Sequence, residues 1–98
     1  MIRKIIYDYF NFVEIQCFYK LIYTKDKDYL LLFGKNLKKL REERKLSQEE
    51  LANLSEVSLP QITRIERGVI NPTICTIKSL ANGLELKMSS MFVFEENK

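Results

Sequence analysis

Residues 47–68 read SQEELANLSEVSLPQITRIERG and predict two short helices joined by a tight turn. Ser47 is suited to cap the first helix, because its hydroxyl can accept a hydrogen bond from an unpaired amide of the first turn. Glu50 follows three residues later and completes a capping box. Ser58 is a second capping residue, and Pro60 falls in the first turn of the second helix, where its missing N–H costs little.

The apolar residues of both segments recur at helical spacing. Five of them are expected to face inward: Leu51, Ala52, Leu54, Ile62 and Ile65. Five residues of the second segment are expected to face outward: Leu59, Gln61, Thr63, Arg64 and Arg67. Gly68 then ends the second helix, because glycine readily takes the left-handed conformation that often follows a helix.

This pattern resembles the lambda-repressor/Cro-type (Xre-like) helix-turn-helix DNA-binding domain. The matching residues are Ser47 to Ala52, Val57, Ser58, Ile62, Ile65 to Gly68, Asn71 to Thr73, Leu80 and Ala81. The resemblance covers roughly residues 33–94 and implies a compact all-α fold of five helices. Lys45 and Glu56 depart from the family, which commonly has glycine at both positions, so each is expected in a conformation that glycine takes more readily.

The 98 residues allow one small domain, so we expect no separate effector-binding domain among them. The formal charge of +3 is only mildly basic, so the prediction of a nucleic-acid partner depends on where the basic residues lie. Cys17 and Cys75 lie far apart and the chain has no histidine, so we expect a reduced cytoplasmic protein without a metal or cofactor. No apolar run is long enough to span a membrane, and Asp8 and Glu14 interrupt the segment that would otherwise suggest a signal peptide.

Residues 1–32 differ from the rest, with all five tyrosines, three of the six phenylalanines, and no glycine or proline. Their apolar residues fit a helical face in part and strand alternation in part. Three interpretations remain open: an added element that covers the domain or a partner, a poorly ordered leader, or a stretch upstream of the true start. The polar run at 24–28 is expected to be a linker.

The remaining elements complete the predicted domain at 33–94, followed by a polar tail at 95–98. A first helix from Phe33 is expected to turn Leu37 and Leu40 inward. After a loop, Thr73 is expected to cap a fourth helix with five apolar residues: Ile74, Ile77, Leu80, Ala81 and Leu84. A short fifth helix near Met88 is expected to add Met91 and Phe92 to the core.

The resemblance places four residues where family members point into the major groove: Leu59, Pro60, Gln61 and Arg64. Arg64 can bond guanine through two donors, Gln61 can address adenine, and the two apolar residues can pack on a thymine methyl. Four more residues are candidate phosphate contacts: Gln48, Thr63, Arg67 and Asn71. The alternative for these polar residues is ordinary helix capping or solvation of a surface helix.

Arg41 and Glu66 match a pair that, in related domains, joins the first and third helices through a structural ion pair. Cys75 has no base beside it in the sequence and is expected to be a structural thiol. Adjacent glutamates on a helix point in different directions, so they form no convergent acid/base site. We therefore expect no enzymatic activity.

The resemblance implies a sequence-specific regulator of transcription, a repressor or autoregulator that binds an inverted-repeat operator on duplex DNA as a homodimer. Small stand-alone repressors and restriction-modification controller proteins share the pattern. The alternative is an antitoxin-like or protein-interaction module that binds a toxin or a polymerase. The predicted dimer surface comprises Leu86, Met88, Met91, Val93 and Phe94, unless all five pack inside their own subunit.

Overall fold

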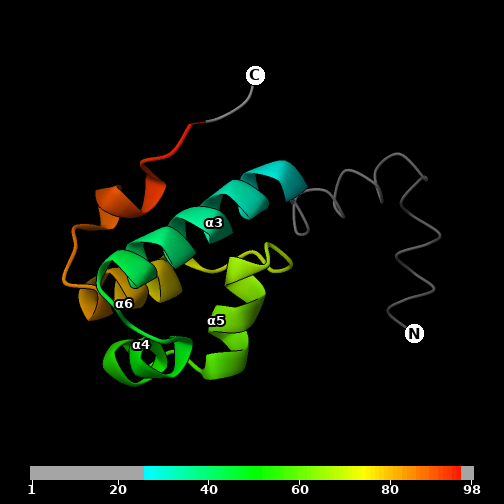
Figure 1. The fold of residues 1–98 in the computed structure, drawn as a ribbon. Helices are drawn as coiled ribbons and strands as arrows, with labels where there is room; N and C mark the ends of the chain where they lie inside the picture. Colours follow the sequence, from blue (N-terminus) through cyan, green and yellow to red (C-terminus); the bar gives the residue numbers. More distant parts are fainter. Residues whose placement is uncertain (1–25, 96–98) are drawn as a thin grey trace, which may run out of the picture.

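The computed structural model describes residues 26–95 and contains helices and no strand within that range. The elements are α3 (Lys27–Glu43), α4 (Gln48–Ser55), α5 (Leu59–Glu66), α6 (Ile74–Gly83) and the 3₁₀-helix η1 (Met88–Phe92). Figure 1 shows α3 lying along one side of the bundle, between η1 and α5, with α4 and α6 on the other side. The all-α prediction is confirmed, although the predicted fifth helix is a single 3₁₀ segment.

The helix-capping residues predicted from the sequence occupy the predicted positions. Ser47 Oγ accepts from the Glu50 amide at 3.1 Å, and the Glu50 carboxylate accepts from the Ser47 amide at 3.0 Å. Ser58 and Thr73 cap α5 and α6 through their side-chain oxygens. Each cap satisfies an amide that the helix itself leaves unpaired, so these residues determine where the helices begin.

The first helix begins six residues before the expected start at Phe33. Asp26 caps it by accepting from the Tyr29 amide at 3.0 Å, so part of the expected linker belongs to the helix. Leu30 is only 8% exposed, and the Tyr29 ring lies 5.3 Å from that of Phe94. The predicted boundary between residues 32 and 33 therefore cuts through α3, whereas the remainder of the predicted extension, residues 1–25, lies outside the described residues.

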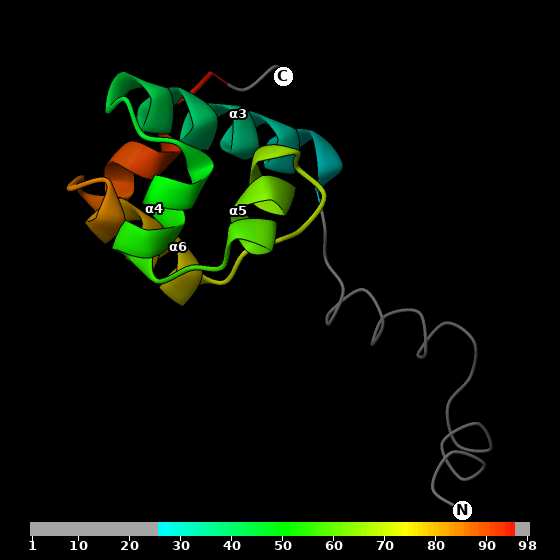
Figure 2. The same cartoon turned by 60° about the horizontal axis from the view of Figure 1, so that its bottom comes forward.

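The core draws on every helical element. Seven large side chains are fully buried: Leu37, Leu51, Ile62, Ile65, Leu80, Leu84 and Met91. In the second view, α4 and α5 lie below α3 and beside α6, which agrees with the packing of α4 against both α5 and α6 (Figure 2). In the predicted helix-turn-helix pair, α4 thus packs against α6 and α5 packs against α3.

Three residues expected in the core lie on the surface instead: Leu54, Ile74 and Phe92. Phe92, the last residue of η1, is 39% exposed, although its ring centroid lies 5.3 Å from that of Phe33. Leu54 is 59% exposed, because Ser55 takes the inward position on α4 and bonds the Leu51 carbonyl through its hydroxyl at 2.6 Å. Ile74 is 73% exposed. Helical spacing aligns it with the buried Ile77, but the neighbouring elements do not cover the first residue of α6.

Side-chain-bearing residues with positive φ follow three of the helices. Lys45 has φ +56° and Glu56 has φ +59°, at the two positions where the family commonly has glycine. Glu85, after α6, has φ +56° and was not foreseen. The left-handed conformation costs an ordinary residue about 1–2 kcal/mol, which the packing of the adjoining helices must offset.

Gly34 allows α3 and α5 to approach closely. A Cβ atom at this position would lie 2.3 Å from the Ile65 carbonyl oxygen and 2.7 Å from that of Glu66. Both atoms belong to the backbone of α5, so neither can rotate away. Glycine is therefore required here by contact with a second helix and not by its own backbone conformation.

Candidate nucleic-acid interface

Helix α5 is fixed on one face and open on the other. Ile62 and Ile65 are 0% and 1% exposed and anchor the helix to the core. Ser58 Oγ accepts a hydrogen bond from the backbone N–H of Gln61 at 3.4 Å, which fixes the first turn of α5. This anchoring leaves Arg64 on the exposed surface in the last turn of the helix.

The four predicted base-contacting residues all belong to α5, but they differ in exposure. Pro60 and Arg64 are exposed, whereas Leu59 and Gln61 are half-buried. The Gln61 amide Nε2 lies 3.5 Å from Thr76 Oγ1 on α6, a long hydrogen bond that turns this side chain toward the neighbouring helix. Thr76 was not among the predicted site residues, since nothing local to α5 indicates that α6 begins beside it.

The four predicted phosphate contacts separate into two pairs. Arg67 and Asn71 are exposed, at the end of α5 and in the loop that follows. Gln48 and Thr63 are half-buried and bonded to each other, with Thr63 Oγ1 donating to Gln48 Oε1 at 3.1 Å. Within residues 26–95, neither Arg64 nor Arg67 forms a salt bridge, so both guanidinium groups remain available for an external anion.

The predicted pair of Arg41 and Glu66 forms a two-pronged ion pair between α3 and α5. Arg41 Nε donates to Glu66 Oε2 at 2.7 Å, and Nη2 donates to Oε1 at 3.0 Å. The two side chains are only 10% and 4% exposed. Arg41 Nη1 also donates to the Leu46 carbonyl at 2.8 Å, so one guanidinium joins α3, α5 and the segment before α4.

The hydrogen bond to Glu66 raises the pKa of Arg41 above its ordinary value, and burial of the guanidinium acts in the opposite direction. Arginine is already charged at any physiological pH, so this shift does not produce a pH switch. The geometry accordingly supports a structural role. A buried pair of this kind stabilises mainly because removal of one partner leaves the other charge buried and unpaired.

The predicted dimer surface is only partly accessible. Met91 is 0% exposed and belongs to the core of its own subunit, so its assignment to an interface is wrong. Leu86, Met88 and Phe94 are partly buried and pack against the same core. Val93, by contrast, is 73% exposed.

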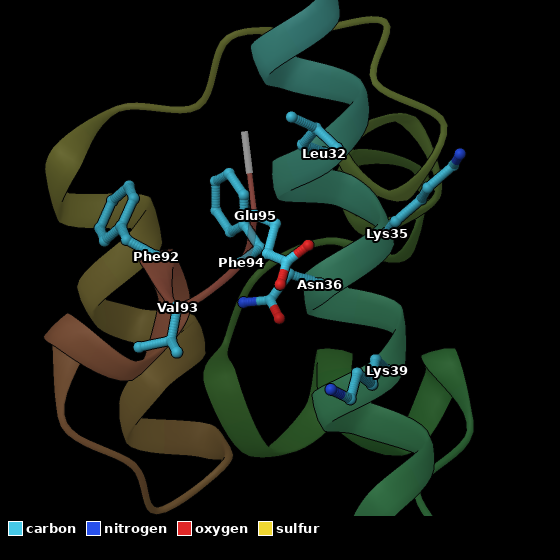
Figure 3. A pocket seen from close by; sticks show the side chains of 8 residues that line it. All are labelled: Leu32, Lys35, Asn36, Lys39, Phe92, Val93, Phe94 and Glu95. Carbon is cyan, nitrogen blue, oxygen red and sulfur yellow. The ribbon is translucent and has the colours of Figure 1, made fainter. Parts of the chain in front are cut away.

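A shallow groove lies beside Val93, between α3 and the C-terminal segment. It is lined by Leu32, Lys35, Asn36, Lys39, Phe92, Val93, Phe94 and Glu95. Figure 3 shows the two lysines on α3 and the apolar side chains of Phe92 and Val93 on the opposite wall. Asn36, which was not among the predicted site residues, holds this segment by donating from Nδ2 to the Met91 carbonyl at 2.8 Å.

Other chemistry is sparse in the part of the chain that the structure describes. Cys75 is exposed and forms no disulfide there. No cluster of three histidine, cysteine, aspartate or glutamate residues is positioned to hold a metal ion among residues 26–95. Nor does that range contain a helix long and apolar enough to cross a membrane.

The comparison with known families agrees with this arrangement. Residues 37–90, more than half of the chain, match the family described as Helix-turn-helix. The chain therefore belongs to the helix-turn-helix family, as the sequence resemblance predicted. The matched range contains both α4 and α5.

Two curated relatives are named as repressors. The chain is 51% identical over 57 residues to the HTH-type transcriptional repressor RghR of Bacillus subtilis (strain 168), covering 55% of this chain and 41% of RghR. It is 34% identical over 58 residues to the immunity repressor protein of Bacillus phage phi105, covering 59% and 40%. The chain thus spans about two fifths of the length of these relatives.

Two solved structures of restriction-modification controller proteins are similar over most of their length. C.AhdI from Aeromonas hydrophila is 36% identical with a TM-score of 0.63, covering 64% of this chain and 96% of C.AhdI. Wild-type C.Esp1396I is 31% identical with a TM-score of 0.63, covering 68% and 87%.

Proposed function

We propose that this protein binds duplex DNA sequence-specifically in the cytoplasm and acts as a repressor or autoregulator of transcription. The observation that carries the proposal is α5, a helix anchored by Ile62 and Ile65 that presents Arg64 outward without a salt bridge among the described residues. A helix of this kind fits the major groove, where an arginine can bond the O6 and N7 atoms of guanine together. The naming of two relatives as repressors supports the regulatory role.

In this proposal Arg64 reads a guanine, and Leu59 and Pro60 pack against a thymine methyl group at the start of α5. Gln61 addresses adenine after giving up its long bond to Thr76. The phosphate contacts are Arg67 and Asn71, both exposed beyond the last turn of α5. Base contacts specify the site, whereas phosphate contacts fix the register of the protein on the duplex.

The test compares Arg64→Ala with Arg67→Ala on a site obtained by binding-site selection. Arg64→Ala is expected to lower specific affinity by about 1–3 kcal/mol and to relax preference at one base pair. Arg67→Ala is expected to weaken specific and non-specific DNA alike and to reduce the salt slope by about one contact per half-site. Lys38→Ala, which removes the same charge from the exposed side of α3, is the control. Unchanged selectivity in Arg64→Ala would contradict the assignment.

We further propose that the protein acts as a homodimer on an inverted repeat. One recognition helix contacts too few base pairs to find a genomic site among many competing sequences. Two copies related by a two-fold axis would place their α5 helices about 34 Å apart, which is one turn of DNA. The exposed Val93 and the adjacent groove are the surface that we assign to this pairing.

A further inference from the structure

A chain of polar contacts connects the buried ion pair to the middle of α5. The Glu66 carboxylate accepts from Arg41 and, through Oε1, from Gln48 Nε2 at 3.0 Å. Gln48 Oε1 in turn accepts from Thr63 Oγ1 at 3.1 Å. Thr63 directly precedes Arg64, the proposed base-reading residue.

The direction of each bond in this chain follows from the ion pair. An ionised carboxylate can only accept, so Glu66 requires the N–H side of the Gln48 amide. The oxygen side of that amide must then face Thr63, whose hydroxyl supplies the only proton between them. Since the buried carboxylate is fixed by Arg41, the orientation of the Gln48 amide is fixed as well.

The side chain of Gln48, on α4, bonds two residues of α5 that lie about one helical turn apart. Gln48 is the first residue of α4, and its two partners, Thr63 and Glu66, lie three residues apart on α5. Residues at this spacing lie on one face of a helix. A single amide that bonds both therefore opposes rotation of α5 about its axis relative to α4, and such a rotation would change where Arg64 points.

We propose that Gln48 and Thr63 are positioning residues, which hold α5 so that Arg64 points toward its base pair. The sequence pattern predicts phosphate contacts for both residues instead. This proposal rests on the proposed DNA-binding role of α5. Both side chains are half-buried, and their facing polar atoms are bonded to each other. The Thr63 hydroxyl also lies 3.1 Å from the Leu59 carbonyl one turn back in α5, so its single proton has two acceptors inside the protein.

The two roles give opposite results in a salt titration. A lost phosphate contact lowers the salt slope and weakens all DNA sequences equally. A lost positioning contact relaxes base preference and leaves the number of released counterions unchanged. The variants are Thr63→Val, which keeps the branched shape without the hydroxyl, and Gln48→Met, which removes the amide. Thr63→Ser keeps the hydroxyl and serves as the rescue.

In full-length protein, Thr63→Val and Gln48→Met are each expected to reduce discrimination at the Arg64 base pair about tenfold, with an unchanged salt slope. Thr63→Ser is expected to restore discrimination. A slope lower by about one contact per half-site with unchanged selectivity would identify a phosphate contact and overturn the proposal. Unchanged selectivity and unchanged slope would overturn it as well.

A measurement without DNA separates this proposal from the proposed function. Residual dipolar couplings of the α5 amides report the orientation of that helix relative to α3 and α6. These couplings are expected to differ from the wild-type values in Thr63→Val and to match the wild-type values in Thr63→Ser. If the wild-type protein selects no DNA sequence, the proposed function fails, and the couplings alone decide whether Gln48 and Thr63 orient α5. Couplings that do not change would refute that orientation.

Discussion

Replacing Gly34 with alanine sets two physical effects against each other. Gly34 lies inside α3, where helix propensity alone predicts that alanine stabilises by about 1 kcal/mol. The new Cβ atom, however, would lie 2.3 Å from the Ile65 carbonyl oxygen, whereas ordinary contacts begin near 3.4 Å. The last turn of α5 would have to withdraw by about 1 Å, because neither backbone can yield locally.

Such overpacking costs about 1–3 kcal/mol, and the withdrawal also loosens the Arg41–Glu66 ion pair that joins the same two helices. With the propensity gain of about 1 kcal/mol subtracted, overpacking alone leaves about 0–2 kcal/mol. The loosened ion pair adds to this cost, so we expect a net destabilisation of about 2 kcal/mol. For a domain of this size each kcal/mol lowers Tm by about 4–8 °C, so the expected decrease is about 8–16 °C.

Circular dichroism during thermal and denaturant unfolding measures this change. Lys35→Gly and Lys35→Ala, made at the adjacent exposed position of α3, give the propensity difference without a clash. Alanine should be more stable than glycine at position 35, whereas at position 34 alanine should be less stable than glycine. A Gly34→Ala variant that melts above the wild type would refute the argument that α3 and α5 require glycine at their contact.

Three further changes test the ion pair, the dimer and the start of the domain. Arg41→Met should cost about 3–5 kcal/mol, because it leaves the buried Glu66 carboxylate without its cation. Val93→Asp should give a folded monomer in analytical ultracentrifugation, since this residue is exposed and central to the proposed interface. A chain begun at Leu32 should have a free energy of unfolding about 1.5–3 kcal/mol below that of the wild type, because it lacks the buried Leu30 side chain.

Each of these predictions has a matched control. The double variant Arg41→Met/Glu66→Met should recover most of the lost stability, and a double variant as unstable as the single one would contradict the unpaired-charge argument. Leu54→Asp places a charge on another exposed apolar residue and should leave the dimer intact. A chain begun at Asp26 keeps the α3 cap and should retain the stability that the shorter chain loses. Equal melting of the two shortened chains would show that the first turns of α3 add nothing.

The sequence by itself determined where α4, α5 and α6 begin and which two residues, Lys45 and Glu56, take the left-handed conformation, but it determined neither the start of α3 nor the positive φ of Glu85. Ser47, Ser58 and Thr73 cap helices where they were expected to, because a cap bonds an amide within three residues of itself. Lys45 and Glu56 have positive φ for an equally local reason, since each lies within two residues of the end of a helix in a tight connection. These signals involve only neighbouring residues, so a pattern of residue types is sufficient to find them.

Tertiary structure decided which side of each helix is covered and which polar groups meet. Leu54 and Met91 are similar apolar residues, yet one is 59% exposed and the other fully buried, because burial depends on whether another element lies opposite. The bond between Gln48 and Thr63 joins residues fifteen positions apart, and the requirement for Gly34 comes from carbonyl groups on a different helix. Helical periodicity specifies the direction of a side chain relative to its own axis. What that side chain contacts is specified only when the helices pack.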